Sequence, residues 1–173
     1  MKEVNLMLET TLKLINELVY IKCGLHLSSL KLNSESVAYG ACSYELDGLK
    51  IEHRTSKTTP TKSGQFVTIW KRSEEGITTP FDISDDIDFV VITSGSSENL
   101  GQFIFPKAVL IEEGIFSQNG KGGKRGIRVY PPWDTTQGKQ ATKTQDWQAK
   151  YFLTIRSDGP IDLDRGMQLF GNK

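Results

Sequence analysis

The sequence has 173 residues, of which 37% are hydrophobic and 24% are charged, a composition that excludes an intrinsically disordered chain and favours one folded domain. It has no run of the roughly 18 apolar residues that a membrane-spanning helix needs, because charged residues interrupt even the most apolar stretch, 6–23. Its 21 basic and 21 acidic residues balance, which excludes a chain that is basic throughout but leaves room for local basic patches.

The N-terminal segment is typical of an amphipathic helix. Apolar residues recur at spacings of three and four between positions 4 and 19, and Gly24 supplies a helix end. Because no basic region with a cleavage site precedes it, we expect no export signal, a cytoplasmic location and no membrane partner. A second helix is predicted over 34–46, followed by a turn at Asp47-Gly48.

The middle of the chain shows strand periodicity separated by turn residues. A short helix is predicted over 107–113, beginning after Pro106, and a mobile glycine-rich loop over 118–126. The predicted strands cover 49–54, 65–71, 87–93, 101–105 and 127–130.

The last part of the chain predicts a helix that begins at Thr144 and includes Trp147 and Phe152, then a polar tail from about residue 158. The order of elements favours an α/β (α+β) fold, a mixed sheet with flanking helices. We expect one domain over 1–173, with the helix 1–23 packed on a core of 34–155.

One candidate binding segment covers 54–72, which holds five basic residues and no acidic one. Its bases and hydroxyls are the groups that hold phosphates, and the spacing of a nucleotide-hydrolysing P-loop is absent. The alternative is a solvated hairpin rim in which Trp70 belongs to the core. The candidate residues are Arg54, Lys57, Thr59, Thr61 and Lys62.

A second candidate segment joins a basic loop to aromatic residues over 120–134. Cations attract a nucleic-acid backbone, and aromatic rings stack on its bases. The alternative is a solubilising loop with its aromatic rings turned into the core. The candidate residues are Lys124, Arg125, Arg128, Tyr130 and Trp133.

Catalytic candidates are fewer. A metal-dependent nuclease needs carboxylates for a divalent cation and a lysine near the attacking water, and the available groups are Glu45, Asp88, Gln102 and Lys107. The expected acid two residues before Lys107 is replaced by Phe105, so a solvated acidic loop is the alternative. No cofactor is expected, and Mg²⁺ or Mn²⁺ would be needed only by a nuclease. The two cysteines, Cys23 and Cys42, are predicted to be buried thiols.

Several long motifs resemble the bacterial MepB family, which is encoded beside multidrug efflux genes. They cover about residues 35–155 and include the 54–72 segment, Gln102-Phe-Ile-Phe-Pro-Lys107, Gly126-Ile-Arg-Val-Tyr-Pro-Pro-Trp-Asp134 and Thr144-Gln-Asp-Trp-Gln148. The resemblance implies a three-layer fold similar to restriction endonucleases and Holliday-junction resolvases. Its core would use the helix 34–46, the strands at 65, 87 and 101, the helix at 107 and the strand at 127.

The function that these features favour is nucleic-acid binding on a nuclease-like scaffold with a degenerate catalytic centre. One alternative is a divalent-metal-dependent nuclease with an atypical site, and another is a ligand or protein adaptor linked to drug resistance. A binding protein would show salt-sensitive affinity without turnover, a nuclease would require metal, and an adaptor would show neither. The sequence leaves open DNA against RNA, strandedness and oligomeric state.

Overall fold

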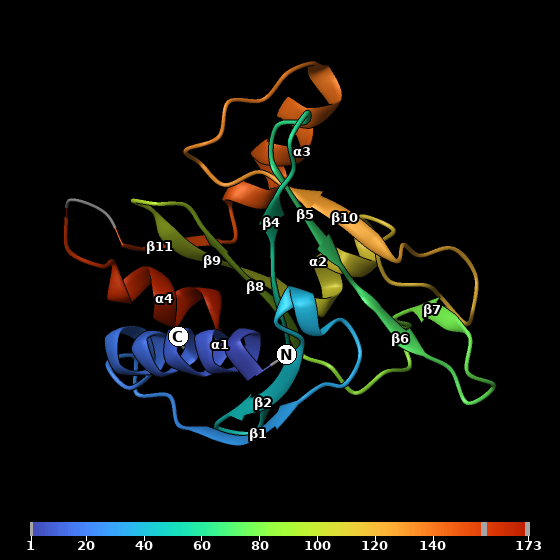
Figure 1. Cartoon of the computed structure of the whole chain (residues 1–173), viewed down its shortest axis with the longest axis horizontal. Coiled ribbons are helices and arrows are strands. Elements are labelled where there is room, and N and C mark those ends of the chain that lie inside the picture. Colours follow the sequence, from blue (N-terminus) through green and yellow to red (C-terminus); the bar gives the residue numbers. More distant parts are fainter. Residues whose placement is uncertain (1, 157–158, 172–173) are drawn as a thin grey trace.

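The structure is a computed structural model that describes residues 2–156 and 159–171 (Figure 1). No helix in this described part is both long and apolar enough to cross a membrane. The helical elements are α1 (Lys2–Ile15), the π-helical turn η1 (Asn16–Tyr20), the 3-10 turn η2 (Val37–Tyr39), α2 (Lys107–Glu112), α3 (Lys139–Ala149) and α4 (Leu163–Leu169). The strands are β1 (Leu27–Leu32), β2 (Cys42–Leu46), β3 (Leu49–Thr55), β4 (Lys57–Thr58), β5 (Gln65–Thr68), β6 (Trp70–Arg72), β7 (Thr78–Pro80), β8 (Phe89–Gly95), β9 (Leu100–Pro106), β10 (Gly126–Val129) and β11 (Phe152–Arg156).

The main sheet has six strands in the order β1-β2-β3-β8-β9-β11. Its neighbours are antiparallel except for β3 and β8, which are parallel. Parallel neighbours need a long connection, and here that connection contains β4, β5, β6 and β7. Thus the basic segment predicted at 54–72 leaves the main sheet between two of its central strands.

Side chains of the main sheet alternate between two hydrophobic clusters. On β8, Phe89 and Val91 face the cluster formed with α1 and α4, whereas Val90 and Ile92 face the cluster beneath α2 and α3. Both faces of this strand are therefore buried, which explains its nearly continuous apolar sequence.

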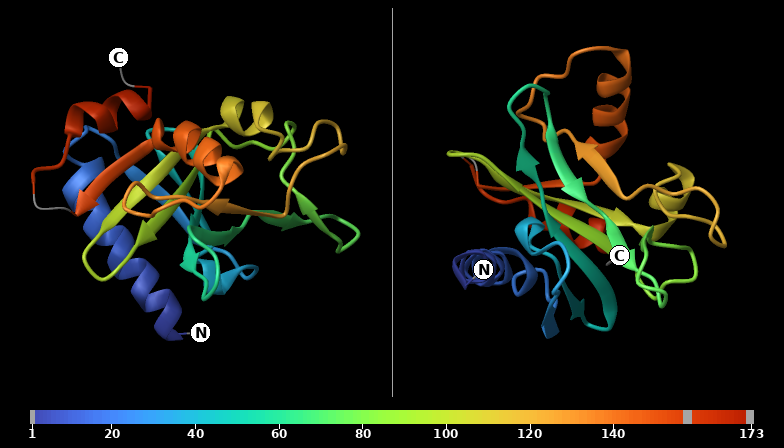
Figure 2. Two further views of the ribbon diagram at one scale, coloured as in Figure 1. Left: turned by 90° about the horizontal axis from the view of Figure 1, so that it is seen from above. Right: turned by 45° about the vertical axis from the view of Figure 1, so that its right-hand side comes forward.

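A second sheet lies on the α2 and α3 side, in the order β10-β5-β4 (Figure 2). Val67 of β5 and Ile127 and Val129 of β10 are buried in the cluster on that side. The intervening residues of these two strands face away from the cluster and are half-buried. One face of this small sheet is thereby left for other contacts.

The structure confirms the predicted mixed sheet with flanking helices, and also the helix at the N-terminus, the strands at β3, β8, β9 and β10, and the helix α2. Gly24 and Gly114 follow helices with φ of 74° and 69°, as expected for residues that end them.

The helix predicted over 34–46 is wrong. Only η2 is helical there, and residues 42–46 form β2, in which Cys42, Tyr44 and Leu46 are buried at alternate positions. Asp47 and Gly48 have φ of 50° and 84°, the conformation of a two-residue hairpin turn, and β2 pairs with β3 across it. Period-two burial and the hairpin partner therefore outweigh the helical spacing of the apolar residues.

Three further predictions need correction. The C-terminal helix begins at Lys139 rather than Thr144, and Phe152 starts strand β11 instead of continuing that helix. The segment expected as a polar tail contains α4, and Phe170 after it is buried; residue 158, where the tail was expected to begin, lies outside the described residues. The strands at 65 and 127 belong to the second sheet, so the predicted six-element core does not form one sheet.

Candidate functional site

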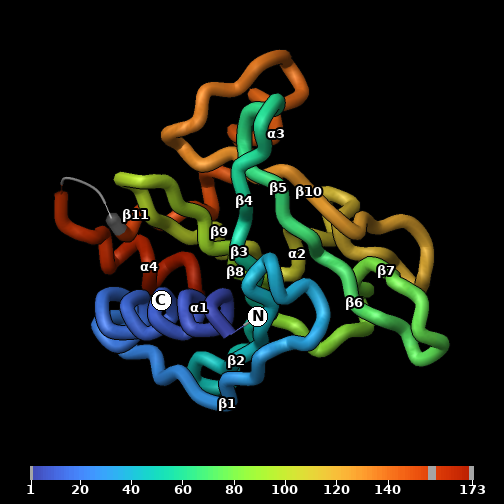
Figure 3. The backbone as a smooth tube through the Cα atoms, viewed as in Figure 1, coloured from blue at the N-terminus to red at the C-terminus, as the bar shows by residue number. Residues whose placement is uncertain are grey.

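The β4–β5 hairpin presents the predicted polar residues at the surface. Lys57, Thr61 and Lys62 are exposed, and Thr59 is half-buried. The hairpin projects beside the segment that leads into α3, as the backbone trace in Figure 3 shows. Residues 58–59 and 62–64 line a shallow pocket together with Asp134 and Thr135.

Arg128 on β10 is tied to this hairpin. Its guanidinium donates hydrogen bonds to the carbonyl oxygen of Ser63 at 3.2 Å and to the hydroxyl of Thr59 at 2.7 Å. A guanidinium has five N–H donors, so donors remain for a phosphate. These contacts orient the Arg128 side chain at the junction of β5, β10 and the hairpin.

Arg54 is not part of any surface. Its side chain is 1% exposed and forms an ion pair with Glu52 at 2.6 Å, and Nη2 donates to the carbonyl oxygen of Trp70. Its guanidinium also lies 5.6 Å from the ring centroid of Phe81. The prediction that Arg54 contacts a phosphate is therefore corrected: strand β3 turns this side chain into the protein.

A groove of about 430 Å³ runs between β10 and α3. Lys124, Arg128 and Lys143 line it, with Glu113 as its one acidic lining residue. In the middle, the side chain of Gln148 on α3 accepts from the Tyr130 N–H at 2.8 Å and donates to the Arg128 carbonyl at 3.0 Å. These two bonds pair backbone groups on the edge of β10 that faces away from β5, and they fix the distance between β10 and α3.

The aromatic candidates differ in exposure. Tyr130 lines the groove but is only 9% exposed. Trp133 is half-buried and meets the Phe152 ring edge-on at a centroid distance of 5.6 Å. Trp147 also lines the groove and packs against Phe105. Both tryptophan rings therefore pack against core residues on at least one side.

Arg125 is exposed, and its backbone carbonyl accepts the Ile69 N–H at 2.9 Å. This bond continues the pairing of β10 with β5 by one residue. Trp70 is predicted to belong to the core if the 54–72 segment is a solvated hairpin rim. In the structure it is half-buried, with the guanidinium of Arg72 5.5 Å from its ring centroid. Among the described residues it belongs to neither core cluster.

Two catalytic candidates, Glu45 and Asp88, meet around Lys50. The Lys50 ammonium pairs with Glu45, and the Lys50 N–H donates to Asp88 at 2.7 Å. The hydrogen bond and charge of Lys50 lower the pKa of the Glu45 carboxyl. A cation bound there would face the ammonium group, so the pair does not fit a divalent metal.

The other two candidates are engaged elsewhere. The Lys107 N–H donates to the Asp88 carbonyl oxygen, but its ammonium donates to the Asp85 carbonyl oxygen at 2.6 Å. Gln102 is completely buried and lies five positions before Lys107, a distance of about 16 Å along an extended strand. Across residues 2–156 and 159–171, no group of three His, Cys, Asp or Glu side chains could hold a metal ion.

Gln102 belongs to a buried chain of hydrogen bonds that the sequence analysis misses. Its Oε1 accepts from the Tyr20 hydroxyl at 2.9 Å, and its Nε2 donates to the Thr93 hydroxyl at 3.0 Å. The two nitrogens of His53 contact Thr93 Oγ1 at 2.8 Å and the Gly40 carbonyl oxygen at 2.9 Å. Because a carbonyl oxygen only accepts, Nδ1 of His53 carries the proton and Nε2 accepts from Thr93.

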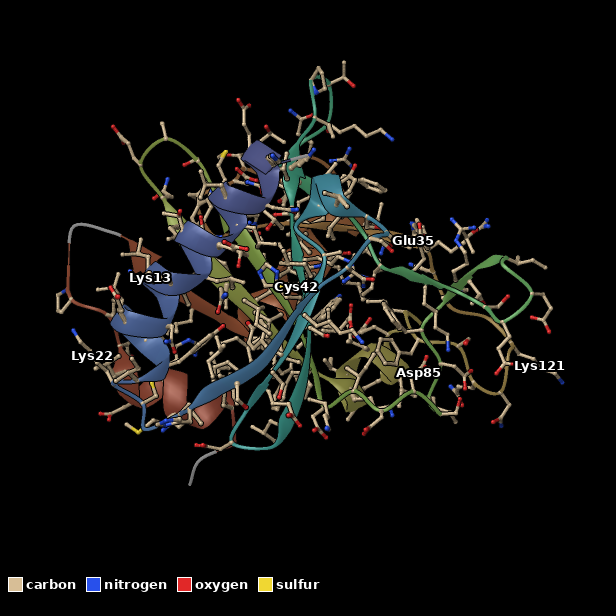
Figure 4. All side chains as sticks on the ribbon, turned by 60° about the horizontal axis from the view of Figure 1, so that its bottom comes forward. Lys13, Lys22, Glu35, Cys42, Asp85 and Lys121 are labelled. Carbon is tan, nitrogen blue, oxygen red and sulfur yellow. The ribbon has the colours of Figure 1, made fainter. Side chains whose placement is uncertain are left out.

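The acidic loop before β8 also has a structural role. The buried carboxylate of Asp82 accepts hydrogen bonds from the Gly120 N–H, the Ser117 hydroxyl and both donors of Ser84. These bonds hold the pKa of the Asp82 carboxyl well below its usual range. These bonds hold the start of the glycine-rich loop in place. Figure 4 shows Asp85 and Lys121 on the side of the molecule away from Lys13 of α1 and Lys22 of the turn after η1.

Comparison with known proteins decides the family. The sequence model of the MepB-like family matches residues 33–154. The chain belongs to the MepB-like family. A solved structure described as the crystal structure of MepB is 33% identical over 76% of this chain and 89% of its own, with a TM-score of 0.73.

A second solved structure is a weaker match. A bacterial homing endonuclease, I-Ssp6803I, is 15% identical over 75% of this chain and 81% of its own, with a TM-score of 0.43, a likeness too distant to bear on activity. No curated protein matches significantly. The MepB-like match begins between β1 and β2 and ends within β11, so it includes every candidate residue above. The elements α1, β1 and α4 lie outside it.

Proposed function

We propose that this protein binds nucleic acid through the groove between β10 and α3 and the adjoining β4–β5 hairpin. The observation that carries the proposal is the gathering of Lys124, Arg128 and Lys143 on one groove of a chain with no net charge. Local charge decides what a surface attracts, because fields fade within about 8 Å at physiological salt. Lys57 and Lys62 on the hairpin extend the positive surface.

We also propose that binding needs no metal and that hydrolysis of nucleic acid is inefficient. Metal-assisted attack on a phosphate needs carboxylates that converge on the ion. Here the Lys50 ammonium pairs with Glu45, and the Lys50 backbone N–H donates to Asp88. The Gln102 amide is hydrogen-bonded inside the core, and the Lys107 ammonium donates to a carbonyl oxygen. These contacts support binding without turnover over the nuclease alternative.

The salt dependence of binding tests the first part. Each phosphate contact contributes about 0.7 to 0.9 to the slope of log affinity against log salt. A Lys124→Gln/Lys143→Gln variant should therefore have a slope smaller by about 1.4 to 1.8, measured by fluorescence anisotropy with labelled DNA and RNA.

The matched control is Lys13→Gln/Lys22→Gln, which removes the same charge from the exposed surface around α1, on the other side of the main sheet. An equal loss of slope in both variants would contradict the proposed groove, and salt-independent affinity of the parent would contradict nucleic-acid binding. Metal-dependent cleavage that is abolished by both Asp88→Ala and Lys107→Ala would establish the nuclease alternative. An adaptor would show neither salt-sensitive binding nor cleavage.

A further inference from the structure

The outer face of the second sheet carries a row of three side chains that sequence reasoning does not connect. Lys57 of β4 lies directly opposite Phe66 of β5, and Phe66 lies directly opposite Arg128 of β10. Directly opposed side chains in a sheet are about 5 Å apart at Cβ. Because their neighbours Val67 and Ile127 face the core, these three residues, which we call the Phe66 row, face away from it.

Phe66 is a half-buried aromatic residue that belongs to neither hydrophobic cluster. Its ring occupies the space above Gly126, where a Cβ atom would lie 2.6 Å from the Phe66 Cζ. Tyr39 of η2 meets the ring edge-on at a centroid distance of 6.0 Å. Gly126 and Tyr39 thus hold the ring in position from below and from one side without covering it fully.

The cations of the row are also held in place. The Lys57 ammonium lies 5.0 Å from the centroid of the Tyr39 ring, and the Arg128 guanidinium is fixed by Ser63 and Thr59. The row therefore presents a half-exposed ring between two positive charges. Arg128 also lines the groove beside α3, so the two surfaces are continuous.

We propose that this face binds an unpaired strand, with one base stacked on Phe66 and neighbouring phosphates bound by Lys57 and Arg128. The proposal rests on the nucleic-acid binding proposed above and adds the substrate class. Every base has an aromatic face that can stack on a side chain, but in a duplex that face is covered by neighbouring bases. A protein that stacks a base therefore prefers single strands, whereas charge alone favours the more densely charged duplex.

The test compares a labelled single strand of about 12 nucleotides with the duplex of the same sequence, by anisotropy at one salt concentration. The parent protein should bind the single strand more tightly. Phe66→Leu should weaken single-strand binding by about 5- to 150-fold, the equivalent of one stacked base, and leave duplex binding unchanged. Phe66→Tyr keeps the ring and should retain the parent's affinity.

Trp70→Leu is the matched control, because it also removes a half-buried ring next to an arginine, outside the row. Thermal unfolding of each variant checks the fold. Equal affinity of the parent for single strand and duplex would overturn the proposal whatever the variants do. So would an equal effect of Phe66→Leu on both ligands, or an equal effect of Trp70→Leu. In those cases salt-sensitive binding through the groove would still stand, whereas a parent that binds neither ligand would refute both proposals.

Discussion

Acidification should destabilise the protein through His53. This side chain is 1% exposed, and burial lowers its pKa from 6.5 to about 4. The neutral ring fits its hydrogen bonds, since Nδ1 donates to Gly40 and Nε2 accepts from Thr93. A second proton would remove the acceptor and place an unpaired charge in the core.

The magnitude follows from proton linkage. Between pH 6.5 and pH 4 the unfolded chain binds a proton at His53 and the folded chain does not, so the free energy of unfolding decreases as pH falls. The difference of about 2.5 pKa units corresponds to about 3 kcal/mol, all of it present above pH 6.5 and lost by about pH 4. The pKa of Glu52, which burial raises, acts in the opposite direction by favouring the folded state as pH falls.

Urea unfolding at several pH values between 7 and 4, followed by circular dichroism, measures this loss in the parent and in His53→Gln. Glu52 and the other carboxyl groups contribute to both proteins, so the parent should lose about 3 kcal/mol more than the variant. Parallel losses in the two proteins would refute the reasoning. If the variant does not fold, NMR titration of the His53 ring decides: a pKa near 6.5 in the folded parent contradicts a buried neutral ring.

Two further predictions concern buried groups. Glu52→Gln leaves the guanidinium of Arg54 buried without its charged partner, so it should cost about 3 to 5 kcal/mol in urea unfolding; Glu45→Gln, which breaks a much more exposed pair, should cost far less, and equal effects would contradict this account. Cys42 is completely buried and its pKa is raised to about 12, chiefly by burial, and Cys23 is also buried with a raised pKa. Neither thiol should react with an aromatic disulfide reagent at pH 8 until the protein unfolds; rapid reaction of the folded protein would show that these residues are accessible.

The local sequence by itself determined the elements whose signals are strong over short distances. These signals are the amphipathic spacing of α1, the apolar run of β8, and the glycines Gly24 and Gly114, which follow η1 and α2. Each acts within a few residues. The two basic segments were also visible, because charge and hydroxyl content are properties of composition. Long motifs in 35–155 were sufficient to indicate the family that the comparison shows.

Only the tertiary structure decided which of those basic residues reach the surface. Arg54 and Lys57 are three positions apart, but β3 buries the first against Phe81 and β4 exposes the second. Lys143 lies in the candidate site because α3 packs along β10, and no local sequence pattern predicts this contact. Phe66 likewise stands between Lys57 and Arg128 only through strand register.

The same reason explains the errors in the fold. Apolar residues recur at helical spacing between 37 and 42, but within 42–46 the apolar residues alternate with polar ones, and pairing with β3 makes this segment a strand. Gln102 is a possible metal ligand in the sequence, but its side-chain amide is hydrogen-bonded to Tyr20 and Thr93. Tyr20 lies far from Gln102 along the chain, and Thr93 lies on the neighbouring strand β8. Local propensities differ by less than about 1 kcal/mol per residue, so burial and hydrogen bonding between distant segments decide the outcome wherever the local signal is weak.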